Sequence, residues 1–256
     1  MKTVILAGGL GTRLSEETST RPKPMVEIGG KPIIWHIMKI YSHHGFNDFI
    51  ICLGYKGYLI KEFFANYYLH QSDVTIDLQS NTTVVHRSNS EPWKITLVDT
   101  GDSTMTGGRL KRVRKYLSEE TFMMTYGDGV SNVDINRLVE FHRSQNTLAT
   151  LTSVKPAGRF GALDIGENKI VQKFTEKPAG DGNWINGGFF VLSSEIFKLI
   201  EGDSSIFEKE TLQEIAKKNQ LSAYHHEGFW MPMDKLSDKL DLEKLWLEGG
   251  APWKVW

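Results

Sequence analysis

The first apolar run of this chain leads directly into a loop of glycines. Val4-Ile5-Leu6 is typical of a buried strand, and Gly8, Gly9 and Gly11 follow it closely. Glycine lets the backbone turn tightly and approach a ligand with no Cβ in the way. Such a loop presents free backbone N–H groups, which bind anions. The strand and its loop therefore predict a cradle for a phosphate group.

Two cationic side chains accompany the loop. Arg13 ends it, and Lys23 follows ten residues later, where they can supply the net charge that backbone amides lack. The spacing differs from the two commonest phosphate loops. It has no Lys-Ser/Thr pair of a P-loop, and Leu14 follows Gly9-Leu10-Gly11 where a dinucleotide fingerprint needs a third small residue. A dinucleotide-binding oxidoreductase is therefore disfavoured.

Helical and strand patterns alternate through the first half of the chain. The pattern predicts helices over 32–41 and 60–68, and buried strands over 49–53 and 122–126. This rhythm favours an open, mostly parallel, Rossmann-like α/β sheet with helices on both faces. Residues 73–99 are rich in β-branched side chains, and we expect them to form a strand-rich excursion from that sheet.

The second half is predicted to begin with strands. These strands are expected over 148–154, 161–165, 169–175 and 184–192, and helices over 193–200, 207–219 and 239–247. The tail at 252–256 carries Trp253 and Trp256. Exposed tryptophans are a liability, so we expect the tail to bury itself against a neighbouring subunit or back on its own chain.

Composition restricts the partners. The 30 basic and 31 acidic residues give a net charge of −1, which attracts neither nucleic acid nor a membrane surface. No run of about 18 apolar residues predicts a membrane span. Cys52 is the one cysteine, so no internal disulfide can form, and its apolar surroundings favour a buried side chain in a reducing compartment, the cytoplasm.

Two aspartates are candidates for a metal site. Asp128 stands between Gly127 and Gly129, directly after the predicted strand 122–126, and ligands bind at this edge of open α/β sheets. A carboxylate there suits Mg²⁺, although Gly-Asp-Gly is also an ordinary turn. Asp234 is either a second metal ligand or the N-cap of the helix that follows.

Two further stretches carry polar groups suited to a phosphorylated sugar. In Glu176-Lys177-Pro178 the carboxylate suits sugar hydroxyls and the ammonium suits a phosphate, with a surface ion pair as the alternative. Asn186-Gly187-Gly188 offers amide groups and close backbone approach.

Before the basic helix 110–117, the hydroxyls of 100–106 beside Gly107-Gly108-Arg109 can bond a base and its phosphates.

The segment Gly8–Arg13 followed by Lys23 resembles the signature of the sugar-1-phosphate nucleotidylyltransferases, also called nucleotide-sugar pyrophosphorylases. The resemblance covers the whole chain and implies one domain over 1–256. Residues 1–146 would mainly bind nucleotide, and 147–256 would mainly bind the sugar phosphate and form an oligomerisation segment. It implies Mg²⁺ as cofactor, held by Asp128 and Asp234.

The resemblance also implies roles for individual residues. Arg13 would hold the leaving pyrophosphate, Lys23 the α-phosphate and Lys177 the sugar phosphate. The nucleotide would contact Leu6, Ala7, Gly8, Gly9, Leu10, Gly11, Thr12, Arg13, Lys23, Thr104, Arg109 and Gly127. The sugar phosphate would contact Gly161, Glu176, Lys177, Asn186 and Gly187.

Within the family, the chain is most similar to members that use CTP and glucose 1-phosphate to make CDP-glucose. The similarity lies in residues 23–32, 98–101, 105–110, 159–164 and 228–230. Ser237 stands where such members are expected to have an arginine, which bears on the choice of sugar. The resemblance implies a homo-oligomer, with a hexamer as one candidate.

The expected chemistry needs no general base. A sugar 1-phosphate has a second pKa near ~6, so its oxygen is already an anionic nucleophile at neutral pH. The protein must position two mutually repelling phosphates and stabilise their charge. The alternatives are the same chemistry with dTTP, UTP or another sugar 1-phosphate, and a catalytically inactive nucleotide-sugar sensor.

Overall fold

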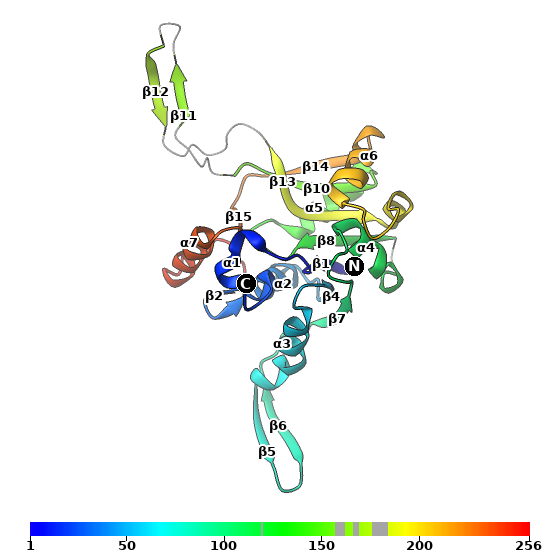
Figure 1. The fold of residues 1–256 in the computed structure, drawn as a ribbon, viewed down its shortest axis with the longest axis vertical. Coiled ribbons are helices and arrows are strands. Elements are labelled where there is room, and N and C mark those ends of the chain that lie inside the picture. Colours follow the sequence, from blue (N-terminus) through cyan, green and yellow to red (C-terminus); the bar gives the residue numbers. More distant parts are fainter. Residues whose placement is uncertain (119, 157–161, 166–168, 176–183) are drawn as a thin grey trace.

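A computed structural model describes residues 1–118, 120–156, 162–165, 169–175 and 184–256. One seven-stranded sheet forms its centre, in the order β14-β10-β13-β8-β1-β4-β7 (Figure 1). Its strands are β1 (Thr3–Leu6), β4 (Asp48–Leu53), β7 (Lys94–Asp99), β8 (Thr121–Tyr126), β10 (Ala149–Val154), β13 (Ile185–Ser193) and β14 (Leu221–His226).

The sheet is parallel except for one strand. β1 pairs in parallel with β4 and β8, β4 with β7, and β10 with β14, whereas β13 runs antiparallel to β8 and β10. Strands from both halves of the chain thus form one sheet. The prediction of an open, mostly parallel α/β sheet is confirmed.

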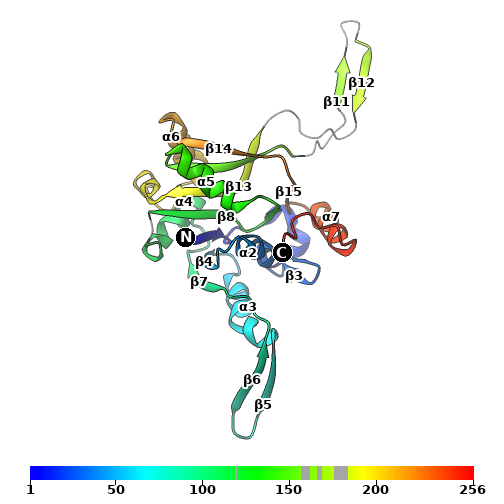
Figure 2. The ribbon, with the colours of Figure 1, turned by 180° about the vertical axis from the view of Figure 1, so that it is seen from behind.

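Helices cover both faces of the sheet (Figures 1 and 2). One face packs against α2 (Ile33–His43) and α5 (Ile135–Gln145), and the other against α4 (Thr106–Val113), a 3-10 helix (Ser194–Leu199) and α6 (Leu212–Lys217). Because both faces are covered, all four residues of β1 are buried. This explains why Val4-Ile5-Leu6 is a continuous apolar run.

The remaining elements complete the body. The helical ones are 3-10 turns at Thr12–Leu14, Lys23–Met25 and Arg114–Tyr116, a π-helical turn at Phe207–Thr211, α1 (Ser15–Thr18), α3 (Gly57–His70) and α7 (Leu236–Leu247). The short strand pairs are β2 (Glu27–Ile28) with β3 (Lys31–Pro32), and β9 (Gly129–Ser131) with β15 (Trp230–Pro232). No helix among the described residues is long and apolar enough to cross a bilayer.

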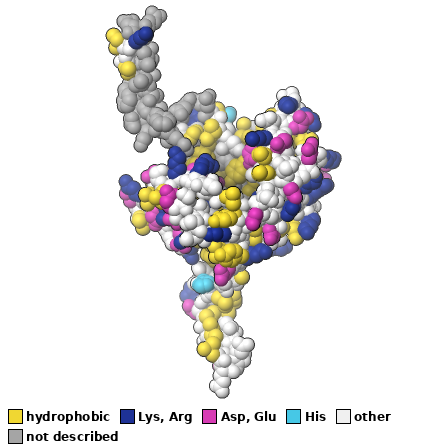
Figure 3. Space-filling model, viewed as in Figure 1, with side chains coloured by type: hydrophobic (Ala, Val, Ile, Leu, Met, Phe, Trp, Pro, Cys, Tyr) yellow, Lys and Arg dark blue, Asp and Glu magenta, His cyan; other side chains and the backbone are white. Residues whose placement is uncertain are grey.

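Two hairpins extend from the body. They are β5 (Ser72–Asp77) with β6 (Thr82–Ser88), and β11 (Ala162–Ile165) with β12 (Val171–Thr175), at opposite ends of the view in Figure 1. Exposed hydrophobic side chains lie along the first hairpin (Figure 3), among them Ile76, Leu78 and Val84.

The predicted excursion over 73–99 is only partly correct. β5 and β6 do leave the sheet, but β7 returns to it and pairs with β4 along its full length, from Lys94 opposite Asp48 to Asp99 opposite Leu53. β7 is one of the two edge strands of the sheet, and its side chains are at most partly buried. Its polar composition therefore resembles that of a peripheral strand.

The aromatic tail packs back on its own chain, which was one of its two expected destinations. Trp253 is fully buried, and its ring stacks on Phe229 and Trp246. Its Nε1–H donates to Nδ1 of His36 at 3.3 Å, and Nε2 of the same imidazole donates to the Ile28 carbonyl at 2.9 Å. These contacts fasten the tail to α2 and to the turn between β2 and β3.

The buried imidazole of His36 makes stability depend on pH. Burial lowers its pKa from 6.5 to about 4. In the unfolded chain His36 is protonated below about pH 6.5, whereas in the folded protein it stays neutral down to about pH 4. The free energy of unfolding therefore falls as the pH drops through this window. We expect the His36 contribution to fall by about 2 kcal/mol between pH 7 and pH 5.

Urea unfolding of wild type and His36→Gln at these two pH values measures this contribution. Burial also lowers the pKa values of His44, His142 and His226, but they contribute equally to both proteins. The variant should lose less stability on acidification. An equal loss in the two proteins would contradict the assignment to His36.

Candidate functional site

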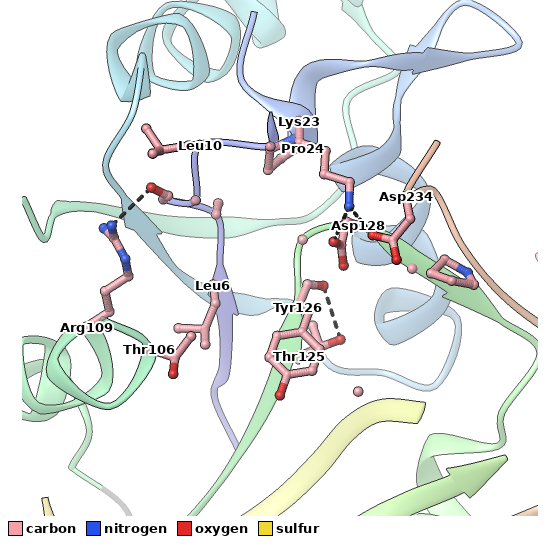
Figure 4. A pocket seen from close by; sticks show the side chains of 18 of the residues that line it. Leu6, Leu10, Lys23, Pro24, Thr106, Arg109, Thr125, Tyr126, Asp128 and Asp234 are labelled. Carbon is pink, nitrogen blue, oxygen red and sulfur yellow. Dashed lines mark hydrogen bonds and ion pairs between the residues drawn. The ribbon is translucent and has the colours of Figure 1, made fainter. Parts of the chain in front are cut away.

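A cavity of about 840 Å³ opens at the carboxyl ends of β1 and β8 (Figure 4). Every described residue that the sequence predicted for the site lines it: Leu6, Ala7, Gly8, Gly9, Leu10, Gly11, Thr12, Arg13, Lys23, Thr104, Arg109, Gly127, Asp128, Asn186, Gly187 and Asp234. Gly161, Glu176 and Lys177 lie outside the described residues. The structure thus brings the predicted nucleotide and metal residues into one cavity.

The glycine loop follows β1, and two of its positions require glycine. Gly11 has a φ of +64°, in the left-handed region, and begins the 3-10 turn that carries Arg13. Gly8 has no room for a side chain, because a Cβ there would lie 2.1 Å from Nη1 of Arg109. The loop can therefore pass closely over a buried guanidinium.

Arg109 fastens this loop to the ends of two other strands. Its Nη2 donates to the carbonyls of Gly8 (3.0 Å) and Asp102 (3.2 Å), and its Nη1 donates to the Leu53 carbonyl (3.0 Å) and to Thr100 Oγ1 (2.8 Å). The residue is only 5% exposed. The sequence predicted a nucleotide contact for Arg109, and the structure adds a role in holding the wall of the cavity.

We expect Arg109→Lys to lower the free energy of unfolding by about 3 kcal/mol. A lysine cannot reproduce the fork of donors, so buried carbonyls lose their partners. Arg112→Lys is the matched control, because Arg112 lies on the same helix with a half-exposed side chain paired to Asp203. Urea unfolding of both variants measures the difference. Equal, small losses would show that the buried fork contributes little.

Cations and carboxylates meet at the opposite wall. Lys23 Nζ donates to Asp128 Oδ2 at 2.6 Å and to Asp234 Oδ1 at 2.8 Å, and Figure 4 shows the three side chains pointing toward one another. Arg13 Nη1 donates to Asp234 Oδ2 at 2.8 Å. Lys23 is 8% exposed, whereas the Arg13 side chain is 72% exposed at the mouth. Two aspartates 106 positions apart in the sequence thus share one ammonium group.

Backbone contacts explain how the two aspartates meet. β9 follows Asp128 and pairs with β15, which precedes Asp234. The Met233 N–H donates to the Asp128 carbonyl at 2.8 Å. Asp238, in the first turn of α7, accepts from the backbone N–H of Asp234 at 2.9 Å. The N-cap of α7 is Lys235, whose backbone N–H also donates to Asp238, so Asp234 is not the cap and its carboxylate points to Lys23 and Arg13 instead.

The donor set of the aspartate pair fits a hard divalent cation. The two carboxylates already converge on a cation, the Lys23 ammonium. Mg²⁺ prefers one or two carboxylates together with phosphate oxygens and water. Among the described residues, no group of three or more His, Cys, Asp or Glu side chains is arranged to hold a metal ion.

The far side of the cavity combines predicted residues with residues that were not predicted for the site. Asn186 and Gly187 lie there at the start of β13, and Trp230 Nε1 donates to the Gly187 carbonyl at 2.6 Å. The unpredicted lining residues include Tyr126, Glu208 and Trp230, whereas Thr106 belongs to the loop whose hydroxyls were predicted to bond a base and its phosphates. Tyr126 precedes the Gly127-Asp128 pair, so its place in the sequence offered a signal, whereas Glu208 belongs to no motif.

Comparison with known proteins identifies the family. The family model described as "Nucleotidyl transferase" matches residues 2–247. The chain belongs to the nucleotidyl transferase family. It is 60% identical over 257 residues to glucose-1-phosphate cytidylyltransferase from Salmonella typhimurium, and the match covers 100% of both chains. A probable glucose-1-phosphate cytidylyltransferase from Bacillus subtilis is 44% identical, also with 100% of both chains covered.

Solved structures share the fold of this chain. HddC from Yersinia pseudotuberculosis has a TM-score of 0.70 at 25% identity, covering 96% of this chain and 99% of that one. An apo UDP-glucose pyrophosphorylase has a TM-score of 0.69 at 16% identity, covering 97% and 98%, and shows a shared fold. The resemblance predicted from the glycine loop and Lys23 is confirmed.

Proposed function

We propose that this protein transfers a cytidylyl group from CTP to α-D-glucose 1-phosphate, giving CDP-glucose and pyrophosphate. The observation that carries the proposal is the convergence of the glycine loop, Lys23 and the aspartate pair on one cavity. The relatives at 60% and 44% identity, which match the chain along its full length, support the choice of CTP and glucose 1-phosphate.

The reaction we propose is a direct displacement at the α-phosphorus of CTP. The dianionic phosphate of the sugar attacks, the bond to the β-phosphate breaks, and pyrophosphate leaves. The backbone amides of residues 8–13 bind the triphosphate. Arg13 at the mouth contacts the leaving pyrophosphate, and Lys23 supplies positive charge beside the α-phosphate. No side chain needs to remove a proton.

Asp128 and Asp234 would hold Mg²⁺. When bound, the metal ion supplies positive charge to phosphate oxygens and so reduces the repulsion between the two substrates. Without the metal ion, both aspartates bond to Nζ of Lys23, which takes the place of a cation between them.

The sugar phosphate is proposed to bind on the side formed by β13. Asn186 and Gly187 line the cavity there and offer amide groups to a polyol. The proposal keeps Gly161, Glu176 and Lys177 as further contacts, with Lys177 on the sugar phosphate. Residues 1–146 then mainly bind nucleotide and 147–256 mainly bind the sugar phosphate.

The test is pyrophosphate release with each of four nucleoside triphosphates and several sugar 1-phosphates. The proposal predicts the highest kcat/KM for CTP with glucose 1-phosphate, and no release without a divalent metal. A preference for dTTP or UTP would change the assigned base. Binding of a nucleotide-sugar without any turnover would favour the sensor.

We also propose that the protein forms homo-oligomers. The exposed side chains of Ile76, Leu78 and Val84 on the β5–β6 hairpin support this, because exposed apolar patches commonly mark contact surfaces. Light scattering should report a mass that is a multiple of the 29.0 kDa chain. A monomer at micromolar concentration would contradict the proposal.

A further inference from the structure

A hydrogen-bonded chain crosses the cavity between its nucleotide and sugar sides. The Tyr126 hydroxyl donates to Glu208 Oε1 at 2.6 Å, and Thr106 Oγ1 donates to Glu208 Oε2 at 2.6 Å. Asn186 Nδ2 donates to the Tyr126 hydroxyl at 3.4 Å. All four residues line the cavity. They come from β8, β13, α4 and the π-helical turn before α6, so the carboxylate is held between distant parts of the chain.

The carboxylate of Glu208 is fixed in position. It stands on the π-helical turn Phe207–Thr211, and the Phe207 N–H donates to Thr106 Oγ1 at 2.9 Å. Turns of this kind occur frequently at functional sites. Figure 4 shows Thr106 and Tyr126 near Leu6, toward the part of the cavity beneath the glycine loop. Glu208 therefore has little freedom to turn away from a bound substrate.

The partners of Glu208 are uncharged. Within the described ranges, its carboxylate bonds to two hydroxyl groups and has no Lys, Arg or His partner. Burial, and then the negative charge of Glu208, raise the pKa of Tyr126, so this phenol stays a donor. Each carboxylate oxygen keeps a second lone pair. An anion here would repel a phosphate, so the substrate atoms that approach it must be uncharged donors.

We infer that Glu208, oriented by Tyr126 and Thr106, determines specificity by accepting a hydrogen bond from an uncharged N–H or O–H donor of the substrate. This inference rests on the proposed function. Two parts of the substrates carry such donors. One is the 4-amino group of cytosine, from which Asp and Glu carboxylates accept hydrogen bonds in protein–DNA complexes. The other is the set of ribose and glucose hydroxyls.

Dissociation constants measured by calorimetry test the inference and identify the donor. Wild type and Glu208→Gln would be titrated with CDP-glucose, UDP-glucose, 2′-deoxy-CDP-glucose and CDP-sugars that each lack one glucose hydroxyl. Removing a charged acceptor should raise the dissociation constant of CDP-glucose roughly tenfold to a hundredfold. The loss should shrink to about twofold or less for the one ligand that lacks the recognised donor. If Glu208→Gln does not fold, Glu208→Asp is titrated in its place.

Glu214→Gln is the matched control, because Glu214 is half-exposed on α6 and pairs with Lys218 outside the cavity. It should bind every ligand as wild type does. An unchanged affinity in Glu208→Gln would overturn the inference, and so would an equal loss for all ligands, which indicates a structural role. Pyrophosphate release by wild type is assayed in parallel, so failure of the proposed function is recognised separately.

Discussion

Asp128→Asn is expected to lower kcat roughly a thousandfold, which corresponds to about 4 kcal/mol of transition-state stabilisation. The substitution removes one of the two carboxylate charges that would hold the metal ion. The fold should persist, because Lys23 keeps its bond to Asp234 at 2.8 Å and the Asp128 carbonyl keeps the Met233 N–H. Pyrophosphate release from CTP and glucose 1-phosphate at saturating Mg²⁺ gives kcat, and thermal unfolding checks the fold.

Asp203→Asn is the matched control for this substitution. Asp203 also pairs with a cation, Arg112, at 2.7 Å, but it does not line the cavity. It should retain wild-type turnover. Near wild-type activity in Asp128→Asn, with an intact fold, would remove Asp128 from the metal site.

Lys23→Met is expected to separate two roles of one side chain. Turnover should fall by roughly a hundredfold to a thousandfold, because the proposed role of Lys23 is to supply a fixed positive charge beside the α-phosphate. Metal binding in the absence of substrate should become roughly tenfold tighter, because the ammonium no longer occupies the space between two carboxylates. Titration with Mn²⁺, followed by electron paramagnetic resonance, measures the second effect directly.

The same variant should also be less stable without metal. Removing Lys23, which is 8% exposed, leaves Asp128 and Asp234 side by side without their shared cation, at a cost of about 3 kcal/mol. Added Mn²⁺ should restore much of this stability. Lys39→Met is the control, since Lys39 pairs with Glu91 away from the cavity. Weaker or unchanged Mn²⁺ binding in Lys23→Met would contradict the competition between the ammonium and the metal.

The parts of the site that lie close together in the sequence could be predicted from it. Residues 6–13 form a strand end and a loop. A glycine in such a loop indicates a backbone conformation that other residues rarely adopt, such as the left-handed φ of Gly11. Gly127 and Asp128 follow Tyr126, the last residue of the buried strand β8, at the edge where α/β sheets bind ligands. Such patterns can be recognised from the sequence because each lies within one short segment and depends on no contact with a distant part of the chain.

The long-range parts could not be derived from local patterns. Asp128 and Asp234 meet because β9 and β15 pair, and strands of three residues are too short to show a period. Arg109 stands in a basic helix, and its sequence neighbours do not indicate that its guanidinium turns inward to Gly8. Glu208 reaches the cavity only because the π-helical turn packs on α4. The family resemblance, and no local pattern, predicts that Asp128 and Asp234 act together.

Crystals of the wild-type protein grown with CTP and Mn²⁺ give the most direct test of the account, through the anomalous scattering of manganese. The account predicts an anomalous peak bound by the carboxylates of Asp128 and Asp234, with the triphosphate lying along residues 8–13. A bound CTP with manganese away from both carboxylates, or a CTP outside the cavity, would contradict it.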